Sequence, residues 1–156
     1  MWCVLRDAKT EDKDLLFKWA NDPDERANAF NSEPIPYEDH CKWFEAKMAD
    51  PDVFIYILID EDDTPIGMVR VEDEAGDGMI SYFVDSRFRG QGYGKKILEL
   101  IERKMERIDG IERLVGEVKF GNLASAKAFE ACGFEKTECD GFWTFQLSAS
   151  TFSPPA

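Results

Sequence analysis

The chain has few of the residues that build metal sites and disulfide frameworks. Its 156 residues include one histidine and 4 cysteines, and no two cysteines form a Cys-x-x-Cys pair. Structural zinc takes four Cys or His ligands at short spacings, so we expect no bound metal. Isolated cysteines are typical of reduced, mostly buried thiols in a cytoplasmic protein. The four are Cys3, Cys41, Cys132 and Cys139.

Long apolar runs and basic residues are also scarce. No stretch of about 20 apolar residues could span a bilayer, and no charged-then-apolar leader opens the sequence. We therefore expect a soluble, cytoplasmic protein that binds no membrane. Lys and Arg number 19 against 32 Asp and Glu, which gives a net charge of −13. Nucleic acid is not an expected partner, because binding it requires a positive surface.

Apolar and aromatic residues, in contrast, are plentiful. Hydrophobic residues make up 44% of the chain and include 12 Phe and 4 Trp. A chain of this length can bury one core without disulfides or metal. We predict a single domain over residues 1–148 and a flexible tail over residues 149–156.

One segment opposes the overall negative charge. Residues 87–96 carry four basic side chains and no acidic one, and they join apolar residues 79–84 to an amphipathic helix. The turn contains Gly90, Gly92 and Gly94, which allow backbone N–H groups to approach an anion at the start of that helix. This arrangement predicts a coenzyme that carries a pyrophosphate. A Walker A loop does not match, because Lys96 follows Lys95 where Ser or Thr is required.

A second segment, residues 118–134, combines an apolar strand with a capped helix. Asn122 is a good N-cap and Gly133 suits the left-handed position that ends a helix. The pattern Arg89-x-x-Gly92-x-Gly94, followed by Asn122-x-x-Ser125 and Gly133-Phe134, resembles the GNAT superfamily of N-acetyltransferases.

Hydrophobic periodicity along the whole chain agrees with that resemblance. It predicts strands at residues 2–6, 53–60, 66–72, 79–85, 113–119, 134–137 and 142–147. It predicts helices that begin at residues 10, 23, 37, 92 and 122. The expected fold class is α+β, with a GNAT-like central mixed, mostly antiparallel sheet of about seven strands flanked by helices.

The resemblance implies that acetyl-CoA is the cosubstrate. In this superfamily the strand before the loop and the strand after the following helix diverge, and the pantetheine arm lies between them. By that resemblance the main chain of Phe83 and Val84 should meet the arm, and residues 89–94 should hold the pyrophosphate. The residues expected to contact the coenzyme are Phe83, Val84, Arg89, Gly90, Gln91, Gly92, Tyr93, Gly94, Asn122 and Phe129.

Acetyl transfer requires that the acceptor amine lose its proton. Glu117 is our first choice for that base or for a base acting through water, because it is a carboxylate in the middle of an apolar strand near the expected divergence. Ser81, Tyr82 and Glu72 are the reserves.

One residue departs from the family pattern. Many GNAT members carry Tyr seven residues after the Asn, as the proposed acid for the CoA thiolate, and Phe129 occupies that position here. A phenyl ring donates no proton. Tyr82, Tyr93 or water could protonate the thiolate instead, or it could leave unassisted.

The acceptor is expected to be a small-molecule amine. Trp19-x-Asn21-Asp22, Arg26 and His40-x-x-Trp43 are similar to the branch of GNAT enzymes that acetylates nucleotide-linked 4-amino-6-deoxy sugars in pseudaminic-acid synthesis. We expect Arg26, His40, Trp43 and Arg70 to bind this acceptor. The alternatives are a peptide N-terminus, a polyamine, or a non-catalytic CoA-binding module. The protein is expected to be a monomer or homodimer.

Overall fold

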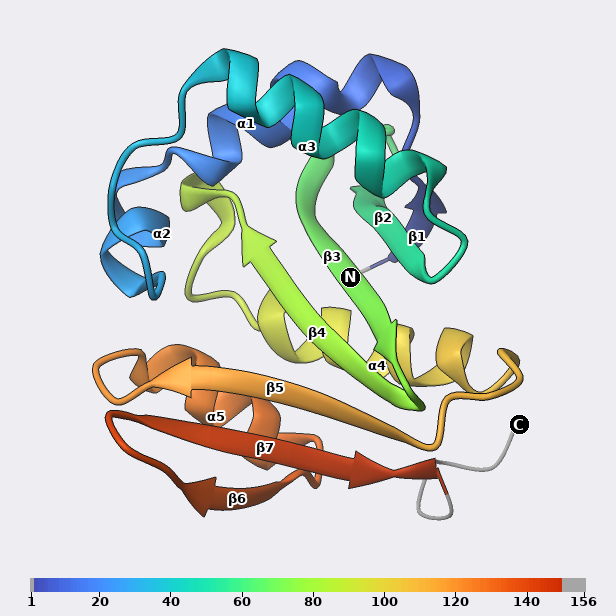
Figure 1. Ribbon diagram of the computed structural model, residues 1–156, viewed down its shortest axis with the longest axis vertical. Coiled ribbons are helices and arrows are strands. Elements are labelled where there is room, and N and C mark those ends of the chain that lie inside the picture. The colour runs from blue at the N-terminus through green and yellow to red at the C-terminus, as the bar shows by residue number, and fades with distance from the viewer. Residues whose placement is uncertain (1, 150–156) are drawn as a thin grey trace.

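The computed structural model describes residues 2–149, which form a seven-stranded sheet with helices on both faces (Figure 1). The strand order is β1-β2-β3-β4-β5-β7-β6. Neighbouring strands are antiparallel except β4 and β5, which are parallel. The predicted mixed, mostly antiparallel α+β sheet is therefore confirmed. The strands are β1 (Cys3–Asp7), β2 (Val53–Asp60), β3 (Pro65–Glu74), β4 (Asp77–Val84), β5 (Arg113–Lys119), β6 (Glu135–Glu138) and β7 (Phe142–Ser148).

Two groups of helices cover the sheet. The helices are α1 (Lys13–Ala20), α2 (Pro23–Asn28), α3 (Tyr37–Ala49), α4 (Tyr93–Met105) and α5 (Leu123–Ala131), with 3-10 turns η1 (Thr10–Asp12) and η2 (Ser86–Phe88). Helices α1 and α3 pack on one face, where Trp19 and Phe44 meet Ile57. Helices α4 and α5 pack on the other, where Ile97 and Phe129 belong to the main core. The sheet is thus buried on both sides near its centre.

Strand β2 shows how the sequence produces these two layers. Successive side chains of a strand point to opposite faces. Ile57 belongs to the cluster beneath α1 and α3, whereas Leu58 belongs to the cluster beneath α4, and both are fully buried. A continuous apolar run, rather than an alternating one, is what a strand covered on both faces requires.

The parallel pair β4 and β5 is joined over only part of its length. Its register runs from Asp77 with Arg113 to Ile80 with Gly116. Beyond that point β4 continues to Val84 and β5 to Lys119 without pairing to each other, and the two strands diverge (Figure 1). The divergence expected from the family resemblance is present, and it leaves two inner strand edges unpaired.

Several boundaries differ from the sequence expectation. Helix α4 begins at Tyr93 because Gly92 is its N-cap, and it ends at Met105, before Ile108. The first helix is preceded by η1, so its α-helical part begins at Lys13. The cysteines are free as expected, but only Cys3 is buried. Residues 150–156, most of the expected tail, lie outside the described residues. Within residues 2–149, no helix combines the length and the apolar character needed to cross a bilayer.

Candidate active site

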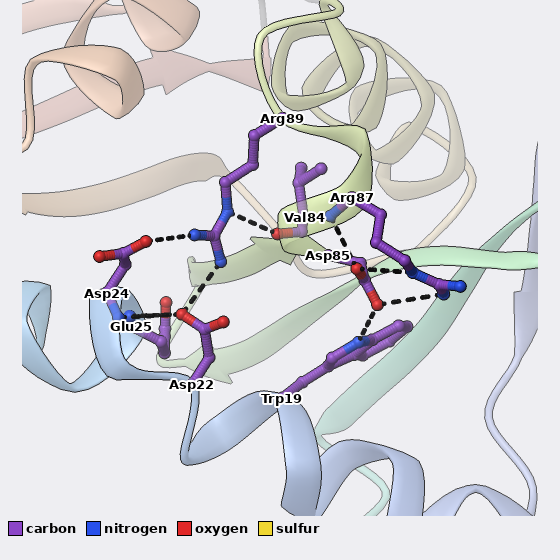
Figure 2. Close-up of polar contacts among 8 residues, drawn as sticks. All are labelled: Trp19, Asp22, Asp24, Glu25, Val84, Asp85, Arg87 and Arg89. Atoms are coloured by element: carbon purple, nitrogen blue, oxygen red, sulfur yellow. Dashed lines mark hydrogen bonds and ion pairs between the residues drawn. The ribbon is translucent and has the colours of Figure 1, made fainter.

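The loop after β4 starts from a buried carboxylate. Asp85 is 6% exposed, accepts a hydrogen bond from Trp19 Nε1 at 3.0 Å, and caps η2 through Arg87 N at 2.9 Å (Figure 2). Burial alone would raise the pKa of Asp85, but the hydrogen bonds from Arg87 and Trp19 outweigh it and lower the pKa to about 2. Asp85 therefore stays ionised and fixes the start of the loop against α1.

Two glycines give the loop its shape. Gly90 and Gly92 have φ values of 75° and 86°, in the left-handed region that other residues adopt only with strain. A Cβ at either position would meet nothing within 4 Å, so no neighbouring protein atoms require these glycines. Gly92 is the N-cap of α4 and has no side chain to cap the helix. The N–H groups of the first turn of α4 therefore need another acceptor, and a phosphate would supply one.

This loop borders a cavity of about 570 Å³, which we call the coenzyme cavity. Its other walls come from α2, the end of β4 and α5, and Lys95 and Lys127 contribute positive charge. Most residues expected to contact the coenzyme line it: Phe83, Val84, Arg89, Gly90, Gly92, Tyr93, Gly94 and Asn122. Gln91 and Phe129 do not. Gln91 is exposed on the loop, and Phe129 borders a second cavity instead.

Arg89 lies differently from the sequence expectation. Its guanidinium turns toward α2, where Nη1 donates to Asp24 at 2.7 Å and Nη2 donates to Asp22 at 3.1 Å (Figure 2). Its Nε donates to the Val84 carbonyl at 3.0 Å. Asp22 in turn caps α2 through the backbone N–H groups of residues 24 and 25. In this structure Arg89 joins the coenzyme loop to α2, and its charge is already shared with two carboxylates.

The main chain of Phe83 does not face the unpaired edge of β4, which differs from the expectation. Asp85 N donates to Ile66 O on β3, at 2.8 Å. Because backbone groups of successive strand residues point to opposite edges, Phe83 faces β3 as Asp85 does, whereas Tyr82 and Val84 face the divergence. Phe83 therefore does not offer its main chain to the pantetheine arm. The carbonyl of Val84 does lie on that edge, but Arg89 already donates to it.

The second cavity has a volume of about 530 Å³ and lies on the other side of the divergence, and we call it the acceptor cavity. Helices α1, α2 and α3, strands β3 to β5 and the start of α5 border it. The two cavities share six lining residues: Glu25, Asn28, Tyr82, Phe83, Asn122 and Ser125. The cavities therefore meet where β4 and β5 separate.

The cationic side chains that line the acceptor cavity form ion pairs or hydrogen bonds with other groups of the protein. Arg70 pairs with Glu72 at 2.8 Å and lies 5.0 Å from the centre of the Trp43 ring. Arg26 Nη1 donates to two loop carbonyls, and Lys119 Nζ donates to the Ala29 carbonyl at 2.9 Å. Three carboxylates line the same cavity, those of Glu25, Asp39 and Glu117. Within residues 2–149 no hydrogen bond or ion pair engages their side chains.

Three of the four candidate catalytic residues, Glu117, Ser81 and Tyr82, border the acceptor cavity, in different environments. Glu117 is exposed at the cavity wall, directly after the last residue of β5 that pairs with β4. Ser81 accepts a hydrogen bond from Arg70 at 3.3 Å. Glu72, a reserve candidate, forms ion pairs with Lys47 and Arg70 and is not among the lining residues.

Tyr82 is, with Ser125, one of the two residues that bring a hydroxyl group to the junction of the two cavities. Its OH lies 3.0 Å from Ser125 Oγ. Burial raises the pKa of Tyr82 to about 12. The phenol therefore stays protonated at neutral pH and can donate a proton.

Phe129 is a packing residue. It is 2% exposed and stacks on Phe145 with ring centres 5.1 Å apart, and it contacts Phe134 edge-on. A Cβ on Gly116 would lie 2.3 to 3.0 Å from three carbons of its ring, so Gly116 is required for the ring to fit. The ring also packs against Tyr82 in a T-shaped pair, with ring centres 6.0 Å apart.

His40 and Trp43 line the acceptor cavity from α3. His40 is 3% exposed and its Nε2 lies 2.8 Å from the Lys13 carbonyl. A carbonyl only accepts, so we assign the ring proton to Nε2. The histidine thereby joins α3 to α1, and its role here is structural.

Comparison with known families agrees with this geometry. A model of the acetyltransferase (GNAT) domain matches residues 3–135, most of the chain. The chain belongs to the GNAT acetyltransferase family. The predictions of an acyltransferase and of acetyl-CoA as its cosubstrate are thus confirmed.

One sequence relative and two solved structures are similar to the chain at low sequence identity. An uncharacterised protein of Methanocaldococcus jannaschii is 24% identical over 150 residues, and the match covers 93% of this chain but 31% of that protein. The chain thus spans about a third of this relative's length. A spermidine N-acetyltransferase from Vibrio cholerae, solved with CoA and spermine, has a TM-score of 0.86 at 14% identity and covers 96% of this chain and 97% of its own. An aminoglycoside acetyltransferase solved with coenzyme A and kanamycin has a TM-score of 0.81 at 17% identity, with 97% of each chain covered. At these identities the structural matches establish the fold.

Sequence reasoning missed several residues of this acetyltransferase's site. Glu25, Asn28 and Ser125 line both cavities, and Asp85 anchors the loop. Ser125 was visible as part of the motif that begins at Asn122, but its contact with Tyr82 was not. Glu25 carried no signal, because it follows Asp22 and Asp24 in a short acidic segment that any exposed helix could contain.

Proposed function

We propose that the protein transfers the acetyl group of acetyl-CoA to a primary amine of a small cationic acceptor. The observation that carries this proposal is the meeting of the coenzyme cavity and the acceptor cavity at Tyr82, where β4 and β5 diverge. A thioester in the first cavity and an amine in the second would come together at that junction. Holding two reactants in this way makes the reaction effectively unimolecular.

The charges of the acceptor cavity favour a cationic amine. Its carboxylates, Glu25, Asp39 and Glu117, have no protein partner among the described residues, whereas Arg26, Arg70 and Lys119 do. A ligand with several ammonium groups would neutralise the free carboxylates, and the strongly negative net charge of the chain would attract it. Polyamines have this chemistry, and the similar Vibrio cholerae structure contains spermine.

A second candidate, the nucleotide-linked amino sugar suggested by the sequence resemblance, is favoured by one observation. Arg26 Nε is buried without a hydrogen-bond partner among the described residues. A phosphate oxygen could accept from it. One such donor would leave most of a diphosphate's charge uncompensated beside three carboxylates, so we place this acceptor second.

Tyr82 is our choice for the group that protonates the departing CoA thiolate. It supplies at the cavity junction the hydroxyl that Phe129 lacks, and burial keeps it protonated. Ser125 extends the hydroxyl pair toward the start of α5. Tyr93, the alternative, lies in the coenzyme cavity and is 9% exposed, but it does not border the acceptor cavity.

The proposal is tested by measuring CoA release from acetyl-CoA with a panel of amines. Spermidine, spermine, kanamycin, an N-terminal peptide and a uridine diphosphate 4-amino sugar cover the candidate classes. We expect the polyamines to have the highest kcat/KM. Preference for the sugar nucleotide would replace this proposal with the second candidate. Coenzyme binding without turnover of any amine would instead indicate a non-catalytic CoA-binding module.

A further inference from the structure

We infer that Glu25 binds the ammonium group of the acceptor and takes its proton before acetyl transfer. This inference rests on the proposed function, because it names the residue that prepares the amine at the same junction. Glu25 lies on α2, outside the strand and loop motifs from which the coenzyme site is built. Its only sequence context is a short acidic segment.

Glu25 lies where the coenzyme cavity and the acceptor cavity meet. It is the only carboxylate in the described part of the chain that lines both cavities and has no partner for its side chain. Asp24 borders the coenzyme cavity alone and pairs with Arg89, and Glu117 borders the acceptor cavity alone. An amine that attacks a thioester at the junction must pass its proton to a group beside that junction. Tyr82 is there too, but its raised pKa makes it a donor rather than an acceptor.

Helix α2 is attached to the coenzyme loop through Arg89. Asp22 accepts from the backbone N of Glu25 at 3.2 Å and from Arg89 Nη2 at 3.1 Å. Arg89 also donates to Asp24, so both terminal nitrogens of its guanidinium bind carboxylates at the start of α2 (Figure 2). The coenzyme loop and the backbone that carries Glu25 are therefore one connected unit. The backbone that carries Glu25 is thus in place before substrate arrives, which lowers the entropic cost of bringing its side chain to the amine.

The surrounding charges suit a proton acceptor. Burial raises the pKa of Glu25, and Asp22 raises it further, whereas Arg26, Arg89 and Arg70 oppose the shift. The Tyr82 phenol faces the same junction and is neutral. A carboxylate whose pKa lies above the ordinary range takes a proton from an amine more readily than an exposed one.

In the proposed reaction, protons move between the acceptor amine, Glu25, Tyr82 and the CoA sulfur. The acceptor ammonium gives one proton to the Glu25 carboxylate, and the free amine nitrogen forms a bond to the thioester carbonyl carbon. When the carbon–sulfur bond breaks, its electron pair leaves on the CoA sulfur. That sulfur takes a proton from Tyr82, which is restored by the second amine proton. Glu25 then releases its proton to water, and the products are the N-acetylated amine and CoA.

Glu25→Gln tests this role directly, with Glu38→Gln as the matched control. Glu38 is exposed on α3 and lines neither cavity, so its replacement removes the same charge without touching the junction. For Glu25→Gln we expect kcat/KM with spermidine to fall by about 10²-fold or more at neutral pH. The loss should shrink as pH rises and the amine loses its proton unaided. The thermal shift produced by acetyl-CoA should stay the same.

The melting temperature of Glu25→Gln distinguishes a role of Glu25 in proton transfer from a purely structural one. A carboxyl whose pKa is raised on folding stabilises the fold only at low pH, and that contribution is lost as pH rises through the folded pKa. Glu25→Gln should therefore melt at the same or a higher temperature than the wild type at neutral pH, although it is much less active. A lower melting temperature together with a lower rate would indicate a structural residue and overturn the inference.

Two further results separate the inference from the proposed function. If Glu25→Gln keeps the wild-type kcat/KM and pH profile, the role of Glu25 is overturned and acetyl transfer stands. If Glu117→Gln alone loses the kcat/KM that we expect Glu25→Gln to lose, Glu117 has that role instead. If the wild type acetylates no amine, the proposed function fails. Calorimetric titration with spermine then still decides whether Glu25 binds an ammonium group, because Glu25→Gln should weaken binding and Glu38→Gln should not. Absence of spermine binding to the wild type would overturn the inference.

Discussion

Replacement of Gly92 by valine should abolish the stabilisation of the protein by acetyl-CoA. Gly92 caps α4 with φ of 86°, and it lines the coenzyme cavity together with Tyr93, Gly94 and Lys95, whose N–H groups lie in the first helical turn and have no acceptor within the helix. A valine here would meet no protein atom within 4 Å of its Cβ. Its side chain would instead occupy the space over the helix N-terminus that a phosphate needs. It would also strain the left-handed backbone.

Gly110 provides a control for the strain. It has φ of 95°, a Cβ there would also meet nothing within 4 Å, and it lies between α4 and β5, outside both cavities. A residue with Cβ in the left-handed region costs about 1–2 kcal/mol. For a chain of this length that lowers the melting temperature by about 2–8 °C. Gly92→Val and Gly110→Val should therefore be destabilised to a similar extent without ligand.

The two variants should separate when acetyl-CoA is added. At a concentration 100 times the dissociation constant, a ligand stabilises the folded state by about 2.7 kcal/mol. This corresponds to a rise in melting temperature of about 5–11 °C. We expect that rise in the wild type and in Gly110→Val, measured by thermal scan, and little or none in Gly92→Val. Equal shifts in both variants would refute the assignment of this loop to the coenzyme.

The remaining predictions concern the junction and its supports. Tyr82→Phe should lower kcat by about tenfold or more with coenzyme affinity unchanged, because it removes the proton donor. Steady-state kinetics with normal kcat would exclude that role. Gly116→Ala should cost about 1–3 kcal/mol in urea unfolding, because its Cβ would overlap the Phe129 ring. In a double-mutant cycle with Phe129→Leu the two losses should not add. Asp85→Asn should remove about 2 kcal/mol of stability at pH 7, since the pKa of Asp85 falls from 3.8 to about 2 on folding. That stability is present above pH 4 and lost between about pH 4 and 2, so the unfolding free energy of the variant should depend less on pH there.

Features that depend on neighbouring residues could be predicted from the sequence. The glycine turn before α4 and the Asn122 cap of α5 are local arrangements, and the structure contains both. The continuous apolar run of β2 predicted a strand, and the order of strands and helices predicted the sheet. Periodicity and capping act within a few residues, which is why they can be recognised in one sequence.

The least accurate expectations concerned which charged groups stay free. Arg89 was assigned to a pyrophosphate from its place in the motif, but carboxylates 65 and 67 residues away hold its guanidinium. Arg70 was assigned to the acceptor, and in the structure it pairs with Glu72 and packs on Trp43. Composition shows how many charges exist, but only folding decides which of them find partners.

The sequence by itself pointed to the family and to acetyl-CoA through the resemblance of its Arg-x-x-Gly-x-Gly and Asn-x-x-Ser motifs, and it predicted the glycine-rich turn before α4, because glycines, caps and apolar spacing are short-range patterns. The tertiary structure alone decided where β4 and β5 part, after Ile80 and Gly116, that two cavities meet there, and that Glu25 lines both of them. These features depend on contacts between residues far apart in the chain. The burial that raises the pKa of Glu25 exists only when α2 has packed beside the loop.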